Sequence, residues 1–235
     1  MIKLENYEVM GWEHAIRGMR NPMNSWEKSD STWTNGYVGL DYITVQTIGE
    51  YDEYQIGPND KDLMTRLRNA GTDHRKFMRM IVVYVDITAP LYWWKEFDTY
   101  KVGTVANSCS TMHKIQEKEF TLGDFSCEHL TEGSINLLMD IICELNKYRS
   151  FYNRYDESDN KNFTNGPITC KKDLWWQMIQ LLPSSYNQKR TVMLNYEVLA
   201  NIYKSRKNHK LDEWREFCKW CETLPYFKEV VIQEC

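Results

Sequence analysis

The sequence lacks any long hydrophobic run, since its longest wholly apolar stretch is 80–85. A segment that crosses a bilayer needs roughly 20 apolar residues, so we expect no membrane span. The first residues are acidic and carry no apolar core, which argues against a signal peptide and predicts a cytoplasmic protein. The net charge is −4 and the pI is near 5.8. The chain therefore lacks the basic excess typical of proteins that bind nucleic acid polymers or membrane surfaces.

Several catalytic motifs are also missing. There is no Gly-rich phosphate loop, no G-x-S-x-G elbow and no histidine pair at metal-ligand spacing. The seven cysteines are an odd number and scattered, which predicts free thiols. Cys218 and Cys221 have the C-x-x-C spacing of redox and zinc sites, but they lie inside a predicted helix and no second pair accompanies them. We therefore expect no metal site.

Aromatic residues, in contrast, are abundant, with 9 Trp, 15 Tyr and 8 Phe. Large aromatic side chains usually fill cores and subunit interfaces. They also line pockets for flat ligands, and composition alone leaves both interpretations open.

Length and a balance of 42% hydrophobic to 26% charged residues predict one globular domain over 1–235. Residues 153–168 are the most polar stretch and are predicted to be a surface loop. Strands are predicted at 1–10, 37–48, 77–87 and 230–233, with 77–87 buried on both faces. Helices are predicted at 11–20, 61–69, 90–101 (ended by Gly103), 134–152, 172–182, 186–207 and 211–223. The fold class is therefore α+β, a small mixed or antiparallel sheet with a helix-rich second half.

The predicted helix 186–207 carries two polar residues of interest. Asn195 and Arg206 are eleven positions apart, so they share one face about 16 Å apart, while Asn201 lies on a flank. A long polar ligand could span Asn195 and Arg206. A solvated helix face is the alternative interpretation.

Around this helix the sequence resembles the flavin-dependent thymidylate synthases. That family has a Leu-Pro pair, a Tyr, Asn-x-Arg-x-Leu, a further Asn, Leu-Arg, and a His shortly before Glu-Ile-Arg. The residues that match in order, with one deletion after Arg206, are Leu182-Pro183, Tyr186, Asn195, Leu199, Asn201, Arg206, His209, Glu213 and Arg215.

A second stretch, 72–113, resembles the family's first core block, which ends in the signature Arg-His-Arg-x-x-Ser-x-Asn-Glu-x-Ser-x-Arg. The residues placed on it, with one insertion, are His74, Ala89-Pro90, Thr104, Asn107 and Ser110. The cationic part of the signature is absent, however. Thr99-Tyr100-Lys101 stand in place of Arg-His-Arg, Ser108 replaces the Glu, Met112 replaces the last Arg, and Glu197 replaces the Arg of Asn-x-Arg.

The resemblance implies a homotetramer that binds FAD and a pyrimidine nucleotide, dUMP or a relative. It also implies a methyltransferase of nucleotide biosynthesis that moves a one-carbon unit from methylenetetrahydrofolate to the base, with NADPH as reductant. Arg206 would contact and polarise the uracil, and Ser110 and Lys101 would hold phosphate. Glu96 falls near the family's uracil-contacting Gln. The cofactor-binding residues would be His74, Lys101, Asn107, Asn195, Asn201 and His209.

The departures favour two alternatives to an unchanged thymidylate synthase. Each charge-assisted bond to phosphate is worth roughly 1.5–3 kcal/mol, so the lost arginines weaken the family's usual ligand contacts unless other groups compensate. Lys101 restores one charge without the guanidinium fork, and Glu197 would repel a phosphate nearby. Three interpretations stay open: an unchanged thymidylate synthase, a relative with another nucleotide or reaction, and a non-catalytic descendant that binds a nucleotide or a protein.

Overall fold

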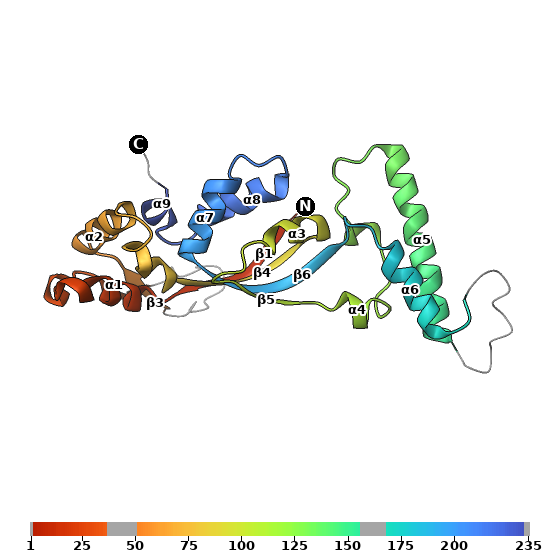
Figure 1. Cartoon of the computed structure of the whole chain (residues 1–235), viewed down its shortest axis with the longest axis horizontal. Coiled ribbons are helices and arrows are strands. Elements are labelled where there is room, and N and C mark those ends of the chain that lie inside the picture. Colours follow the sequence, from red (N-terminus) through yellow and green to blue (C-terminus); the bar gives the residue numbers. More distant parts are fainter. Residues whose placement is uncertain (1, 37–50, 156–167, 233–235) are drawn as a thin grey trace, which may run out of the picture. The chain divides into compact units, whose positions relative to one another are not determined.

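A computed structural model describes residues 2–36, 51–155 and 168–232 (Figure 1). It confirms the α+β class, with small sheets and a helix-rich second half. None of the helices within these ranges is both long enough and apolar enough to cross a bilayer.

The larger sheet has four strands in the order β1-β4-β6-β5. Their bounds are β1 Lys3–Met10, β4 Val82–Pro90, β5 Val105–Ser108 and β6 Asn187–Asn195. A second, two-stranded sheet joins β2 (Thr32–Gly36) to β3 (Tyr51–Gln55) in antiparallel register. In that register Trp33 lies directly opposite Tyr54, which places both side chains on one face of the pair.

The α-helices of the described ranges are α1 Trp12–Arg20, α2 Pro58–Asn69, α3 Leu91–Phe97, α4 Thr111–Lys114, α5 Glu132–Arg154, α6 Lys171–Leu181, α7 Tyr196–Arg206, α8 Asp212–Cys221 and α9 Phe227–Val230. Short 3-10 helices occupy Asn21–Met23 (η1), Trp26–Lys28 (η2), Arg75–Arg79 (η3) and Leu122–Asp124 (η4). Asn195 is the N-cap of α7, since its side chain accepts a hydrogen bond from the Val198 amide at 3.1 Å.

The chain forms two compact units. Unit 1 comprises Met1–Glu5, Asp86–Thr99 and Ala106–Val192, and unit 2 comprises Asn6–Val85, Tyr100–Val105 and Met193–Cys235. The prediction that 1–235 is a single domain stays a prediction.

Each unit has its own apolar core. In unit 1, α5 packs beside α6 (Figure 1), and Leu138, Ile142 and Leu145 meet Met178 there. In unit 2, α7 packs against α8 and η3. The largest fully buried side chains of unit 2 include Trp214, Tyr196, Phe217, Phe227, Ile16, Met78 and Ile81.

Most predicted elements are confirmed, but the helix at 186–207 is wrong in its first half. Residues 187–195 form β6, and only 196–206 are helical. The strand buries Gln188, Val192 and Leu194, an alternation with a period of two that the helical interpretation overlooked. Asn195 is consequently the cap that precedes α7 rather than a residue within a long helix.

Other boundaries also differ. The strand predicted from residue 77 begins at Val82, because Phe77 belongs to η3, and β4 alternates between buried and partly exposed side chains instead of being buried on both faces. The helix predicted to end at Gly103 stops at Phe97. The described part of the strand predicted at 230–233 is not a strand, because Val230 closes α9. The strand at 37–48 and most of the loop 153–168 lie outside the described residues.

Candidate functional site in the Arg206 cluster

Arg206, the residue predicted to meet the base, is the last residue of α7 and is half-buried. Its Nε donates to the Tyr100 hydroxyl at 2.9 Å, and its Nη1 lies 3.0 Å from His209 Nε2. The guanidinium also stacks 4.8 Å from the ring centroid of Trp214. Because three side chains hold the planar cation from different directions, its orientation is largely set by unit 2 itself.

His209 is positioned by the turn that follows α7. The Leu211 amide donates to His209 Nδ1 at 3.2 Å, and Arg215 Nη1 donates to the His209 carbonyl at 2.7 Å. Trp214, which backs the guanidinium, is fully buried at the start of α8. The site therefore lies at the packed junction of α7 and α8.

The segment 100–105 runs beside α7. Tyr100 meets Arg206 at the end of the helix, and Gly103 packs against Asn195 and Val198 at its start. Gly103 has φ +77°, and a Cβ there would come within 2.8 Å of Asn195 Nδ2. A side chain at residue 103 is thus excluded both by its backbone conformation and by the close approach.

Glu197, which stands where the family has an arginine, forms an ion-pair cluster. Its carboxylate accepts a hydrogen bond from Arg75 Nε at 3.2 Å and forms an ion pair with the guanidinium of Arg79. Burial opposes ionisation of this carboxyl, but the hydrogen bonds and charges of Arg79 and Arg75 outweigh it, so the Glu197 pKa lies below its ordinary value. The carboxylate that we expected to repel phosphate is therefore matched by two cations of the same unit.

The remaining predicted residues of unit 2 lie at its surface. His74, Lys101 and Asn201 are exposed, whereas Asn195 and His209 are half-buried. The structure brings Arg206 and His209 into direct contact and places Asn195 at the other end of α7. The predicted FAD-binding roles of these residues stay predictions.

Glu96, Asn107 and Ser110 belong to unit 1. Glu96 is half-buried in α3, and Asn107 is exposed on β5. Ser110 caps α4, since its hydroxyl accepts from the His113 amide at 3.0 Å. The prediction that these three residues bind the same ligands as Arg206 stays a prediction.

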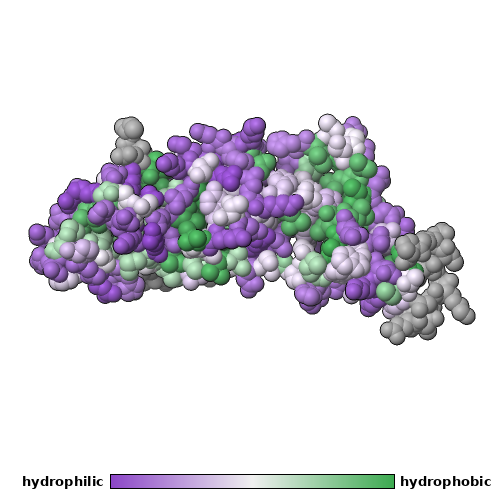
Figure 2. Space-filling model, viewed as in Figure 1, coloured by the Kyte–Doolittle hydropathy of each residue, from purple (hydrophilic) through white to green (hydrophobic). Residues whose placement is uncertain are grey.

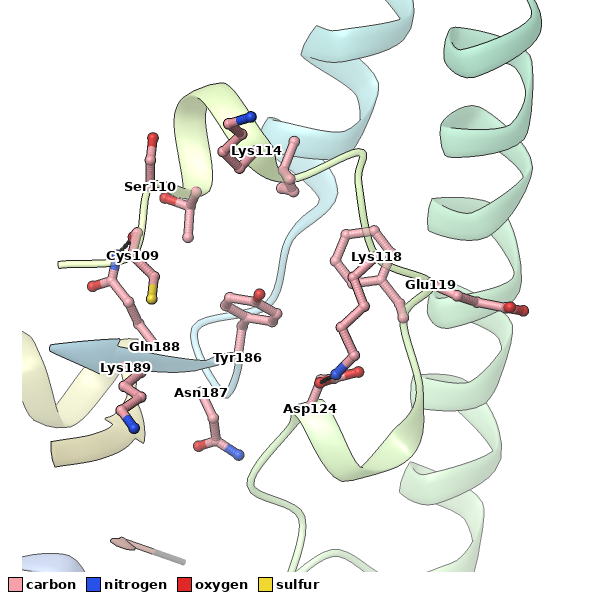
Figure 3. A pocket seen from close by; sticks show the side chains of 13 residues that line it. Cys109, Ser110, Lys114, Lys118, Glu119, Asp124, Tyr186, Asn187, Gln188 and Lys189 are labelled. Atoms are coloured by element: carbon pink, nitrogen blue, oxygen red, sulfur yellow. Dashed lines mark hydrogen bonds and ion pairs between the residues drawn. The ribbon is translucent and has the colours of Figure 1, made fainter. Parts of the chain in front are cut away.

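Ser110 lines a cavity of about 440 Å³ within unit 1. The Tyr186 hydroxyl points into this cavity, and Lys118 extends along its wall to Asp124, 2.8 Å away (Figure 3). Burial raises the pKa of Tyr186, with a smaller contribution from the charges of Asp124 and Cys109. Tyr186, which matches the family's Tyr, is thus a neutral donor at this cavity.

Sequence reasoning missed two residues of the Arg206 cluster, Tyr100 and Trp214. Tyr100 is the middle residue of the triplet that replaces Arg-His-Arg, so its position was flagged, but only Lys101 was assigned a role. Nothing in the local pattern distinguished Trp214 from the other tryptophans. Its role depends on α8 packing against α7.

The C-x-x-C pair lies in α8 with both thiols buried. Burial raises the pKa of Cys218 to about 12 and that of Cys221 well above its ordinary value. Thiols of this kind stay protonated and unreactive. Within the described residues, no group of three or more His, Cys, Asp or Glu side chains is arranged to hold a metal ion.

The fold is that of the flavin-dependent thymidylate synthases, as the sequence resemblance predicted. The chain is similar to the thymidylate synthase ThyX from Helicobacter pylori, solved in complex with FAD and dUMP, with a TM-score of 0.60. The match has 17% sequence identity and covers 100% of this chain and 98% of that chain. A second structure of Helicobacter pylori ThyX with FAD and dUMP matches with a TM-score of 0.60 at 16% identity, covering 99% and 96% of the two chains. No family model and no curated protein matches the sequence.

Proposed function

We propose that this chain binds FAD and a pyrimidine nucleotide, dUMP or a relative, and transfers a one-carbon unit to the base. The observation that carries the proposal is the Arg206 cluster. Arg206 and His209 place nitrogen atoms 3.0 Å apart beside a buried tryptophan ring. A guanidinium that lies over an aromatic ring suits a flat heterocycle with carbonyl oxygens, which uracil and the flavin ring both are.

Several residues around α7 could hold parts of a flavin cofactor. The close approach at Gly103 aligns the segment 100–105 with α7, so that Tyr100 and Asn195 offer a hydroxyl and an amide near its two ends. Lys101 is an exposed amine of the same segment, suited to a phosphate. A bound flavin would supply the electrons for reduction of the one-carbon unit, with NADPH and methylenetetrahydrofolate as the proposed cosubstrates.

In this proposal Arg206 binds and polarises the base. A guanidinium held by Tyr100 and Trp214 needs little reorganisation to donate to a uracil carbonyl, because its orientation is set before the ligand arrives. His209 holds Arg206 in that orientation and meets the flavin.

The direct test is a dUMP titration of the FAD-loaded protein, comparing the wild type with Arg206→Ala and Arg206→Lys. We expect Arg206→Ala to bind dUMP roughly 10- to 100-fold more weakly, since a hydrogen bond to a charged group is worth about 1.5–3 kcal/mol. Arg206→Lys should fall between the two, because lysine keeps the charge without the planar fork. Lys204→Ala, which removes an exposed cation of the same helix, is the matched control and should bind normally. Unchanged affinity in Arg206→Ala would remove the proposed site.

A non-catalytic descendant that binds a nucleotide or a protein is the second candidate. The observation that favours it is the Glu197 cluster, where Arg75 and Arg79 are matched to a carboxylate rather than presented to a ligand. A turnover assay separates the two functions. Formation of dTMP or another altered nucleotide supports the enzyme, whereas tight binding of FAD and dUMP without product supports the descendant.

We also propose that the chain forms a homotetramer. Large apolar side chains are exposed on both units, including Val102 at 90% and Leu137 at 63%. Figure 2 shows hydrophobic residues gathered over the first half of α5, where Leu137 and the 41% exposed Met139 lie. Apolar surface of this kind is typical of subunit interfaces.

A further inference from the structure

A second cavity in unit 2, of about 350 Å³, shares no residue with the Arg206 cluster. Its walls come from the end of β1, the start of α1, the β2–β3 pair and the residues just before α9. The lining residues are Glu8, Val9, Met10, Gly11, Trp12, Glu13, His14, Trp33, Glu53, Tyr54, Pro225 and Tyr226.

Four aromatic rings line this cavity in two pairs. Trp33 and Tyr54 have ring centroids 5.1 Å apart at 68°, and Trp12 and Tyr226 are 5.3 Å apart at 74°. Trp12 and Tyr54 are buried, whereas Trp33 is 54% exposed. Within each pair the rings contact each other edge to face, and the exposed ring of Trp33 is the one that can attract a cation.

The charges that line the cavity have one sign. Glu8, Glu13 and Glu53 are carboxylates, and the described residues that line the cavity include no lysine or arginine. Glu13 also accepts from Trp33 Nε1 at 3.3 Å, which ties one carboxylate to the aromatic wall. The nearby histidine, His14, is hydrogen-bonded to Arg17 at 3.0 Å. Burial, followed by the negative charges of Asp60 and Glu13, raises the pKa of Tyr54, consistent with a negative potential at this wall.

One residue that lines the cavity has an unfavourable backbone conformation. Tyr226 has φ +53°, a left-handed value that is unfavourable for an aromatic residue. Its hydroxyl lies 3.3 Å from the Ile56 amide and donates toward the Tyr54 carbonyl at 3.3 Å. These contacts fix the Tyr226 ring against the aromatic wall, so the cavity is formed before any ligand binds.

We propose that this cavity binds a small organic cation, an alkylammonium or quaternary ammonium ion, against the exposed ring of Trp33 and beside the carboxylates of Glu13 and Glu53. An exposed aromatic ring beside negative charge favours such an ion over a neutral molecule of equal shape. A hydrated metal ion would need several oxygen ligands converging at one point, which separate surface glutamates do not provide.

The experiment is a calorimetric titration of the full chain with choline, with its neutral isostere 3,3-dimethyl-1-butanol and with spermidine, all at constant ionic strength. We expect choline or spermidine to bind and the neutral isostere to bind at least several-fold more weakly. Equal binding of choline and the isostere would show an apolar pocket and overturn the proposal. Failure of both cations to bind at millimolar concentration would overturn it as well.

Variants locate the site. Trp33→Ala should weaken cation binding roughly 5- to 30-fold, the range of a cation–π contact. Glu53→Gln removes one charge at constant volume and should weaken binding while leaving the melting temperature nearly unchanged, which covers the case that Trp33→Ala unfolds. Trp26→Ala and Glu27→Gln, an exposed pair in η2 outside the cavity, are the matched controls. Normal binding by both cavity variants would place the cation elsewhere and refute the assignment.

Discussion

At the scale of single residues, Glu197 is a carboxylate held by two arginines, Arg75 and Arg79. By the sequence resemblance it occupies the position of a motif arginine. The Glu197 pKa is lowered, so the carboxylate stabilises the fold at any pH above its ordinary value of 4.5. That stabilisation is lost as the pH falls through the lower pKa of the folded state.

We predict that Glu197→Gln lowers the free energy of unfolding by about 1–2 kcal/mol at pH 7, a modest loss because Arg79 is half-exposed. The gap between variant and wild type should narrow as the pH drops below 4.5. Urea unfolding at several pH values measures both effects, with Glu27→Gln as the exposed control. A gap that stays constant with pH would mean that the charge of Glu197 is not responsible.

At the scale of elements, one buried carboxylate joins α1 and α2 to the segment before β2. Asp60 is fully buried, and its Oδ1 accepts from Arg20 Nε at 2.6 Å. Its Oδ2 accepts from the hydroxyls of Ser29 at 2.7 Å and Ser31 at 2.6 Å. Burial opposes its ionisation, but the hydrogen bonds from Ser31, Ser29 and Arg20 outweigh burial and lower the Asp60 pKa.

Asp60→Asn should therefore destabilise the protein by about 3–5 kcal/mol, because it leaves the buried guanidinium of Arg20 without its counter-charge. Asp62→Asn, in the same helix but exposed, should change stability by less than about 0.5 kcal/mol. Chemical denaturation of the two variants measures the difference. A small effect of Asp60→Asn would show that the arginine is hydrated in place.

The helices and strands also show how much of the structure could be predicted from the sequence. Helices with a clear period, such as α5 and α8, were placed to within two residues. Residues 187–195 were mistaken for helix because the helical pattern of α7 was extended backward over a strand that alternates weakly. The matched residues Asn195, Arg206 and His209 located the candidate site, but Trp214 joins it only through helix packing, which no local pattern encodes.

At the scale of the whole molecule, the prediction of one domain over 1–235 can be tested against the two compact units. Leu145 in unit 1 and Leu199 in unit 2 are both fully buried. Replacing either with Ala should cost about 2–5 kcal/mol. If the chain is one cooperative domain, both variants lower the same single transition in a calorimetric scan. Two transitions, each moved by only one variant, would show that the units unfold separately.

The central claim is that this chain, although it lacks the arginine signature, binds flavin and a pyrimidine nucleotide. The most direct measurement is the visible absorbance spectrum of the gently purified protein, before and after gel filtration with FAD and dUMP. The Arg206 cluster predicts that flavin absorbance stays with the protein fraction and that dUMP changes the shape of the bands. A colourless protein that retains no flavin, with or without dUMP, would contradict the claim and favour a non-catalytic descendant that has lost the flavin site.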